Sequence, residues 1–123
     1  MFSDMREYIK QVEKLEEIKI IQGADWDLEI GTITEIMAKP GAPLLLFDNI
    51  KGYPSGYRVV TNLAASHQRV CLLLGIQGEE SPLGLVKAWR EKTKQGFKPI
   101  PPVEVKTGPV KENIFRGNDI DLF

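Results

Sequence analysis

Cysteine and histidine each occur only once in this chain of 123 residues. A lone cysteine, Cys71, excludes a disulfide within the chain and is typical of a reducing compartment, so the sequence predicts a cytoplasmic protein. The lone histidine, His67, has neither a second histidine nor a cysteine pair with which to complete a metal site. The two side chains that most often bind transition metals therefore predict no such site.

Neither an excess of one charge nor a long apolar run is present. Lys and Arg number 16 against 17 Asp and Glu, which gives a net charge of −1. Without a basic patch, binding to nucleic acid has no electrostatic source, and we expect no nucleic-acid partner. The longest apolar stretches, 44–47 and 70–74, are far shorter than the ~20 residues of a membrane-spanning helix. Asp4 and Glu7 stand where a secretory signal would be basic or apolar.

Apolar residues make up 42% of the chain and charged residues 27%, which is typical of one domain with a single core. Periodicity and turn residues predict helices at 4–17, from about 25 to 38, at 66–75 and at 82–96, and strands at 18–21, 44–47 and 57–61. The prolines at 99, 101 and 102 exclude a helix beyond them. We therefore predict an α/β fold, with a small sheet flanked by helices in residues 1–97 and an extended Pro-rich arm at 98–123.

The pattern also assigns places to single side chains. The wholly apolar stretch 44–47 is predicted to be a strand buried on both faces. Gly31, inside the second helix, costs about 1 kcal/mol relative to alanine, which predicts close packing there. The predicted helix caps are Asp4 with Glu7, Asp25 or Asp27, Ser66, and Ser81. The predicted inward faces of the four helices are Met5, Tyr8, Ile9, Val12 and Leu15; Ile30, Ile33 and Met37 with Ile36 beside them; Val70, Leu73 and Leu74; and Leu83, Val86 and Trp89.

Side chains that could carry chemistry are dispersed along the chain. Cys71 lies in an apolar run that disfavours a thiolate, and His67 lies in the first turn of a helix, where the dipole disfavours its charged form. Two acidic clusters precede helices, where capping explains them; they are Asp25, Asp27 and Glu29, and Glu79 and Glu80. A third, Asp119 and Asp121, lies in the arm. The glycines of 75–78 follow a helix instead of leading from a strand into one, so they do not form a phosphate-binding loop. These residues alone predict no catalytic, cofactor-binding or metal site.

Several stretches gain meaning from their order and spacing. They are LEIGTIT at 28–34, PLLLFDNIKGY at 43–53, VTNL at 60–63 with Ser66 and Arg69, SPL at 81–83 with AWR at 88–90, IPPVEV at 100–105, GPVKEN at 108–113 and GNDIDL at 117–122. Together they resemble, collinearly over essentially the whole chain, the beginning of the UbiD family of carboxy-lyases. Gly31, where alanine is the expected residue, is a mild departure from that likeness.

The resemblance implies a reversible decarboxylase for aromatic or α,β-unsaturated carboxylic acids. Family members use prenylated FMN held with a divalent metal, typically Mn2+, and K+, and the cofactor supplies the electronic part of the reaction. Their cofactor ligands and acid–base residues lie in a central domain that begins about where this chain ends. The resemblance therefore transfers no catalytic, cofactor-binding or metal residue to this chain, which alone is expected to be inactive and to bind none of these groups.

The last residues, 119–123, are apolar at alternate positions, which predicts that the chain continues and that Leu122 and Phe123 pack against further protein. The partner is then a downstream flavin-binding domain, in an enzyme that is expected to be a homo-oligomer. The alternative is a natural non-catalytic subunit that assembles with a separate catalytic chain. A third possibility, a free-standing ligand-binding module, requires an apolar pocket with convergent polar groups.

Overall fold

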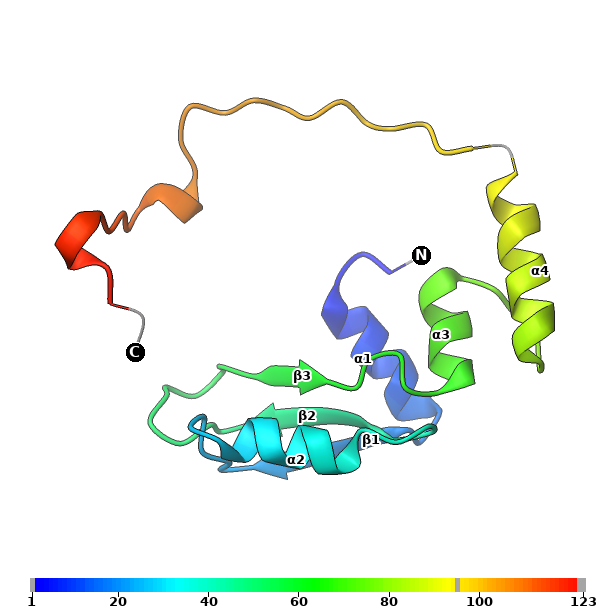
Figure 1. The fold of residues 1–123 in the computed structure, drawn as a ribbon, viewed down its shortest axis with the longest axis horizontal. Coiled ribbons are helices and arrows are strands. Elements are labelled where there is room, and N and C mark those ends of the chain that lie inside the picture. Colours follow the sequence, from blue (N-terminus) through cyan, green and yellow to red (C-terminus); the bar gives the residue numbers. More distant parts are fainter. Residues whose placement is uncertain (1, 95, 122–123) are drawn as a thin grey trace.

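A three-stranded sheet with helices on both faces and an extended arm beyond it make up the chain (Figure 1). The computed structural model describes residues 2–94 and 96–121. Its elements are α1 (Met5–Lys14), β1 (Ile18–Gln22), α2 (Glu29–Met37), β2 (Leu44–Asp48), β3 (Val59–Thr61), α3 (His67–Leu74), α4 (Pro82–Thr93), and two 3-10 turns at Pro109–Lys111 and Gly117–Asp119. The predicted α/β class and the predicted order of helices and strands are confirmed.

The strands lie in the order β1-β2-β3, so β2 is central. β1 and β2 are parallel, with Ile20 beside Leu46, and α2 forms the crossover between them. β3 then runs antiparallel to β2, with Val60 beside Leu46. A parallel pair needs such a crossover, whereas the antiparallel pair is joined by the loop 49–58 alone.

β2 is buried on both faces, as predicted. Its side chains alternate between two separate clusters. Leu44 and Leu46 pack with Tyr8 and Val12 of α1, whereas Leu45 and Phe47 pack toward α2. The second cluster contains Ala24, Leu45, Phe47 and Ile50, with Ile21, Ile30, Ile33 and Met37 against it. One strand therefore supplies the centre of both halves of the core.

Side-chain caps begin three of the four helices where the sequence predicts them. Asp4 Oδ1 accepts the amide of Glu7 at 2.9 Å, while Ser66 and Ser81 cap α3 and α4. The predicted cap of α2 by Asp25 or Asp27 is wrong. The helix begins at Glu29, and its N-cap is Leu28, whose φ is +67° and whose apolar side chain makes no capping bond. Asp25 lies further back, where its carboxylate accepts from Lys51 and from the amide of Asp27.

Some predicted inward faces are also wrong. Met5, Leu15, Ile36, Leu73, Leu83 and Val86 are exposed. In α3 the fully or nearly buried residues are Arg69 and Cys71, and in α4 the buried residue is Leu85. A third cluster, centred on Cys71, Ile76 and Leu85, joins α3 to α4. Leu72 and Arg69 of α3 face the sheet side instead, so the buried residues of these two helices are set by tertiary contacts in two directions.

Gly31 is exposed, and a Cβ placed on it would meet nothing within 4 Å. The predicted close packing at this glycine is therefore absent among the described residues.

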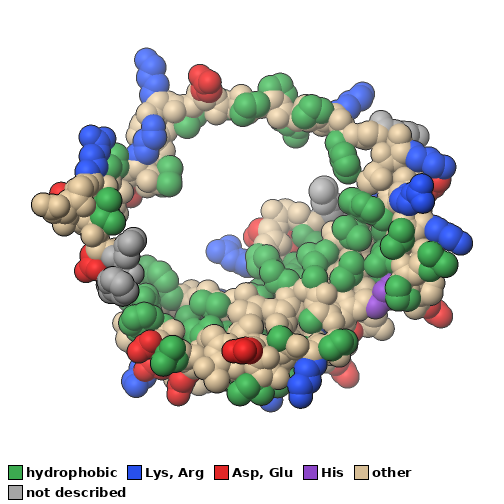
Figure 2. Space-filling view, viewed as in Figure 1, with side chains coloured by type: hydrophobic (Ala, Val, Ile, Leu, Met, Phe, Trp, Pro, Cys, Tyr) green, Lys and Arg blue, Asp and Glu red, His purple; other side chains and the backbone are tan. Residues whose placement is uncertain are grey.

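Beyond α4 the chain leaves the helices and arcs clear of the domain, with an opening between the two (Figure 2). Figure 2 shows apolar side chains along this arm and on the domain surface that borders the opening. The exposed large apolar residues of the arm are Phe97, Ile100, Val103, Val105, Val110, Ile114, Phe115 and Ile120. The expected packing of Leu122 and Phe123 lies outside the described residues. Within those residues, no helix is long and apolar enough to cross a bilayer.

Candidate functional site

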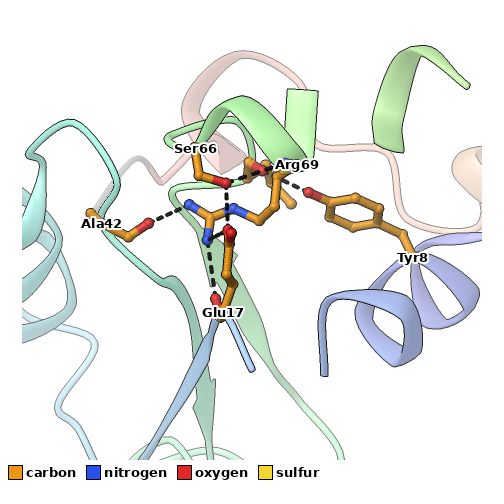
Figure 3. Close-up of polar contacts among 6 residues, drawn as sticks. Tyr8, Glu17, Ala42, Ser66 and Arg69 are labelled. Carbon is orange, nitrogen blue, oxygen red and sulfur yellow. Dashed lines mark hydrogen bonds and ion pairs between the residues drawn. The ribbon is translucent and has the colours of Figure 1, made fainter. Parts of the chain in front are cut away.

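The most buried polar group of the domain is the guanidinium of Arg69, which is 0% exposed (Figure 3). One terminal nitrogen donates to the backbone oxygen of Glu17 at 3.0 Å and to its carboxylate at 2.9 Å. The other donates to the backbone oxygen of Ala42. Arg69 thus joins α3 to the start of β1 and to the residues that precede β2, which are far apart in the sequence.

Ser66 completes this group of side chains. Its hydroxyl donates to the Glu17 carboxylate and accepts the amide of Arg69 at 3.2 Å, so the cap of α3 also orients the counter-ion. The Glu17 side chain is 23% exposed, and its carboxylate accepts from both Ser66 and Arg69. Because Arg69 is fully covered and directed at backbone carbonyls, the arrangement is suited to holding the fold together.

Tyr8 of α1 lies in the first core cluster, near Arg69 (Figure 3). Its hydroxyl donates to the backbone oxygen of Leu63 at 2.7 Å, and its ring contacts Phe2 edge-on with a centroid distance of 5.5 Å. Burial raises the pKa of Tyr8 above its ordinary value, while the charge of Arg69 acts in the opposite direction. Tyr8 therefore stays a protonated donor at neutral pH and has no role as a base.

The lone histidine and the lone cysteine lie together, which the sequence analysis did not foresee. Nε2 of His67 is 2.9 Å from the backbone oxygen of Glu79 and 3.5 Å from Sγ of Cys71. They border a hollow of about 560 Å³ between the end of α1, α3 and the loop before α4. The spacing of four residues on a predicted helix is the signal that could have found this pair.

The pair is poorly arranged for nucleophilic catalysis. A carbonyl oxygen can only accept, so the nitrogen that contacts Glu79 must carry the proton, and it cannot remove one from Cys71. Cys71 is also 8% exposed. The geometry gives a half-buried histidine packed on a thiol.

The acidic residues do not converge. Asp25 pairs with Lys51 at 3.0 Å, and this hydrogen bond, with a second from the amide of Asp27, lowers the pKa of Asp25. Glu29 accepts the amide of Asp25 at 2.7 Å. Among residues 2–94 and 96–121, no three His, Cys, Asp or Glu side chains are grouped so that they could hold a metal ion.

Glu79 and Glu80 lie at the rim of the hollow beside His67, and Asp119 and Asp121 lie in and after the last 3-10 turn. The three groups of acidic residues therefore lie in separate places among the described residues. What the chain does offer in quantity is exposed apolar surface along the arm and on its helices.

Comparisons with known proteins agree on one family. Residues 9–89 match the family model described as the 3-octaprenyl-4-hydroxybenzoate carboxy-lyase N-terminal domain. Pyrrole-2-carboxylic acid decarboxylase of Pseudomonas aeruginosa is 34% identical over 107 residues, which cover 80% of this chain and 21% of that protein.

Solved structures of vanillic acid decarboxylase from Sedimentibacter hydroxybenzoicus are similar in fold. The closed form is matched over 100% of this chain and 26% of that chain, at 28% identity and a TM-score of 0.64. The open form is matched over 82% of this chain and 21% of that chain, at 25% identity and a TM-score of 0.64. The chain spans about a fifth to a quarter of the length of these relatives.

Proposed function

The chain belongs to the UbiD family of carboxy-lyases as an N-terminal domain, and from this premise we propose that it forms part of a reversible decarboxylase for aromatic or α,β-unsaturated carboxylic acids. The observation that carries the proposal is the similarity to decarboxylases over most of the chain. The substrates in the names of those relatives, pyrrole-2-carboxylic acid and vanillic acid, both carry the carboxyl group on an aromatic ring.

In this proposal the complete enzyme uses prenylated FMN with Mn2+ and K+, and residues outside this chain hold them. The described residues do not fit these groups. Their carboxylates are separated, and the one buried cation, Arg69, is directed at Glu17 and at the backbone of Ala42. We therefore assign to this chain the task of packing beside the flavin-binding part.

The second candidate is a natural, non-catalytic subunit that assembles with a separate catalytic chain. One open-form structure of vanillic acid decarboxylase contains a truncated VdcD component, so that relative is described with more than one component. The reading frame after the codon for Phe123 separates the two candidates, because a continuous frame favours the single-chain enzyme and a stop codon favours the subunit. In both cases we propose a cytoplasmic protein, and for the single-chain enzyme a homo-oligomer.

A domain replacement tests the proposal. We expect this chain, alone and supplied with prenylated FMN and Mn2+, to bind no flavin and to release no CO2 from pyrrole-2-carboxylate. A chimera in which it replaces the matched segment of the Pseudomonas relative should release CO2, whereas that relative without the segment should not. Stoichiometric flavin binding by this chain alone would contradict the assigned role, and an inactive chimera that folds and binds flavin would contradict the proposed function.

A further inference from the structure

The outer edge of β1 is open. On the side that faces β2, the backbone oxygen of Glu17 accepts the amide of Leu44 at 2.8 Å. At the other end of β1, the amide of Gly23 donates to the backbone oxygen of Asp48 at 3.1 Å. Backbone groups alternate sides along a strand, so the odd-numbered residues point toward β2. The even-numbered ones, at 18, 20 and 22, point away, and no described strand lies there.

This edge presents apolar side chains on one face and has no proline or bulge to prevent pairing. Ile18 and Ile20 lie on it, Ile20 is 51% exposed, and the strand contains no proline. Such an edge is a template for another strand. Lys19, between the two isoleucines, is exposed and directs its side chain to the opposite face of the sheet.

The arm contains a segment with the matching properties. Residues 98–105 lie in no helix or strand, and within the described chain their backbone forms no hydrogen bond. Val103 is 84% exposed and Val105 is 69% exposed, and Glu104 stands between them. The segment is thus an unpaired stretch of backbone in which apolar and charged side chains alternate from Val103.

We propose that residues 102–106 of a second copy of this chain bind to the open edge of β1 as an antiparallel fourth strand. With Val103 opposite Ile20, Val105 lies opposite Ile18, so apolar side chains meet on one face. Glu104 then lies opposite Lys19 on the other face, which pairs opposite charges.

The same register protects the edge that the new strand creates. The residues of the arm that point away from β1 are then Pro102, Glu104 and Lys106. Pro102 has no amide to offer to a further strand, and charged side chains at an edge discourage addition. Pairing therefore stops after one strand and gives a closed dimer if each copy donates its arm to the other.

A second copy is favoured over the chain's own arm by the position of the arm. In Figure 1 the arm passes on the β3 side of the sheet, above α1 and α3, whereas β1 lies at the opposite edge. The sheet order places β2 and β3 between that side and β1.

Proline substitutions at neighbouring positions test the register. Val103→Pro removes the donor that faces Ile20 and keeps an extended backbone, whereas Glu104→Pro, its matched control, removes a donor that faces solvent. We expect the wild-type chain and Glu104→Pro to sediment as dimers, with slow hydrogen exchange at the amide of Ile20. Val103→Pro should be a monomer in which that amide exchanges at least tenfold faster. A monomeric wild type, a dimeric Val103→Pro, or a loss of the dimer only in Glu104→Pro would overturn the proposal.

A charge exchange tests whether the contact is between copies. Lys19→Glu and Glu104→Lys should each weaken their own homodimer by about tenfold, because each dimer brings two like-charged pairs together. When the two variants are mixed, both sites of the heterodimer hold opposite charges, and we expect the wild-type dissociation constant to return. Slow exchange at Ile20 in a monomer, or no recovery in the mixture, would show the contact to be within one chain or absent. The carboxy-lyase assignment does not depend on either result.

Discussion

Replacing Arg69 by methionine should be among the most destabilising single substitutions in this domain. Arg69 is fully buried, and its guanidinium donates to the carboxylate and the backbone oxygen of Glu17 and to the backbone oxygen of Ala42. Methionine fills much of the same space with a similar aliphatic chain, so the main loss is that of the hydrogen bonds and of the charge.

The magnitude follows from what is left behind. Breaking a buried ion pair by removing one partner costs about 3–5 kcal/mol. The Glu17 side chain is 23% exposed and its carboxylate keeps the hydroxyl of Ser66, so water can replace part of the lost interaction. We therefore expect about 3 kcal/mol, which corresponds to a fall in Tm of about 12 °C for a domain of this size.

Urea unfolding followed by tryptophan fluorescence measures this loss, because Trp89 packs in the α3–α4 cluster. The matched control is Arg58→Met, since the Arg58 side chain is 53% exposed and its ion pair with Asp48 is long, at 3.9 Å. That variant should differ from wild type by less than about 0.5 kcal/mol. If Arg69→Met costs less than about 1 kcal/mol, or no more than the control, the reasoning on the buried guanidinium is refuted.

Three further substitutions test other parts of the fold. Gly31→Ala should raise the free energy of unfolding by about 1 kcal/mol, because alanine favours the helix and its Cβ meets nothing; a destabilised variant in thermal melts would contradict this. The lowered pKa of Asp25 means that its pairing stabilises the fold above the ordinary aspartate pKa and is lost as pH falls through the folded-state pKa. As pH is lowered, the free energy of unfolding should therefore fall less steeply for Lys51→Met than for wild type, and equal slopes would refute the role of the pair. Leu45→Ala should cost about 2–5 kcal/mol in urea unfolding, whereas the exposed Leu73→Ala should cost well under 1; similar losses would contradict the assignment of the core.

Local chemistry made much of the fold predictable. The caps Asp4, Ser66 and Ser81 mark helix starts because each side chain needs only its own next turn as a partner. The apolar stretch of β2 is equally informative, since four consecutive apolar residues between turns have no solvated face.

Features that depend on distant partners were not predictable. Asp25 does not cap α2; its carboxylate binds Lys51, 26 residues further along the chain, and the amide of Asp27. The buried face of α4 follows from its contact with α3, whereas α3 is buried both by α4 and by the partners of Arg69 and Leu72 on the sheet side. Arg69 was noted only as part of a family resemblance, because one sequence cannot show that a charged residue is buried on a partner 52 positions away.

The structure brings together two side chains that the sequence alone leaves separate. His67 and Cys71 do meet, yet the backbone carbonyl of Glu79 occupies the nitrogen that a catalytic base would need. Whether His67 and Cys71 could react thus depends on a contact with the backbone of Glu79, which a sequence pattern does not show.

The four buried residues of β2 have a consequence for how the sheet is aligned. A slip of one residue would send each side chain to the other face, but three leucines and a phenylalanine are so alike that their pattern opposes the slip only weakly. The alignment is instead fixed just before the strand, where Gly41 donates to the oxygen of Ala65 and Ala42 accepts from Arg69. Burial and register are thus specified by different parts of the chain. A folded Arg69→Met protein should show doubled amide resonances along β2, as two sheet alignments exchange slowly.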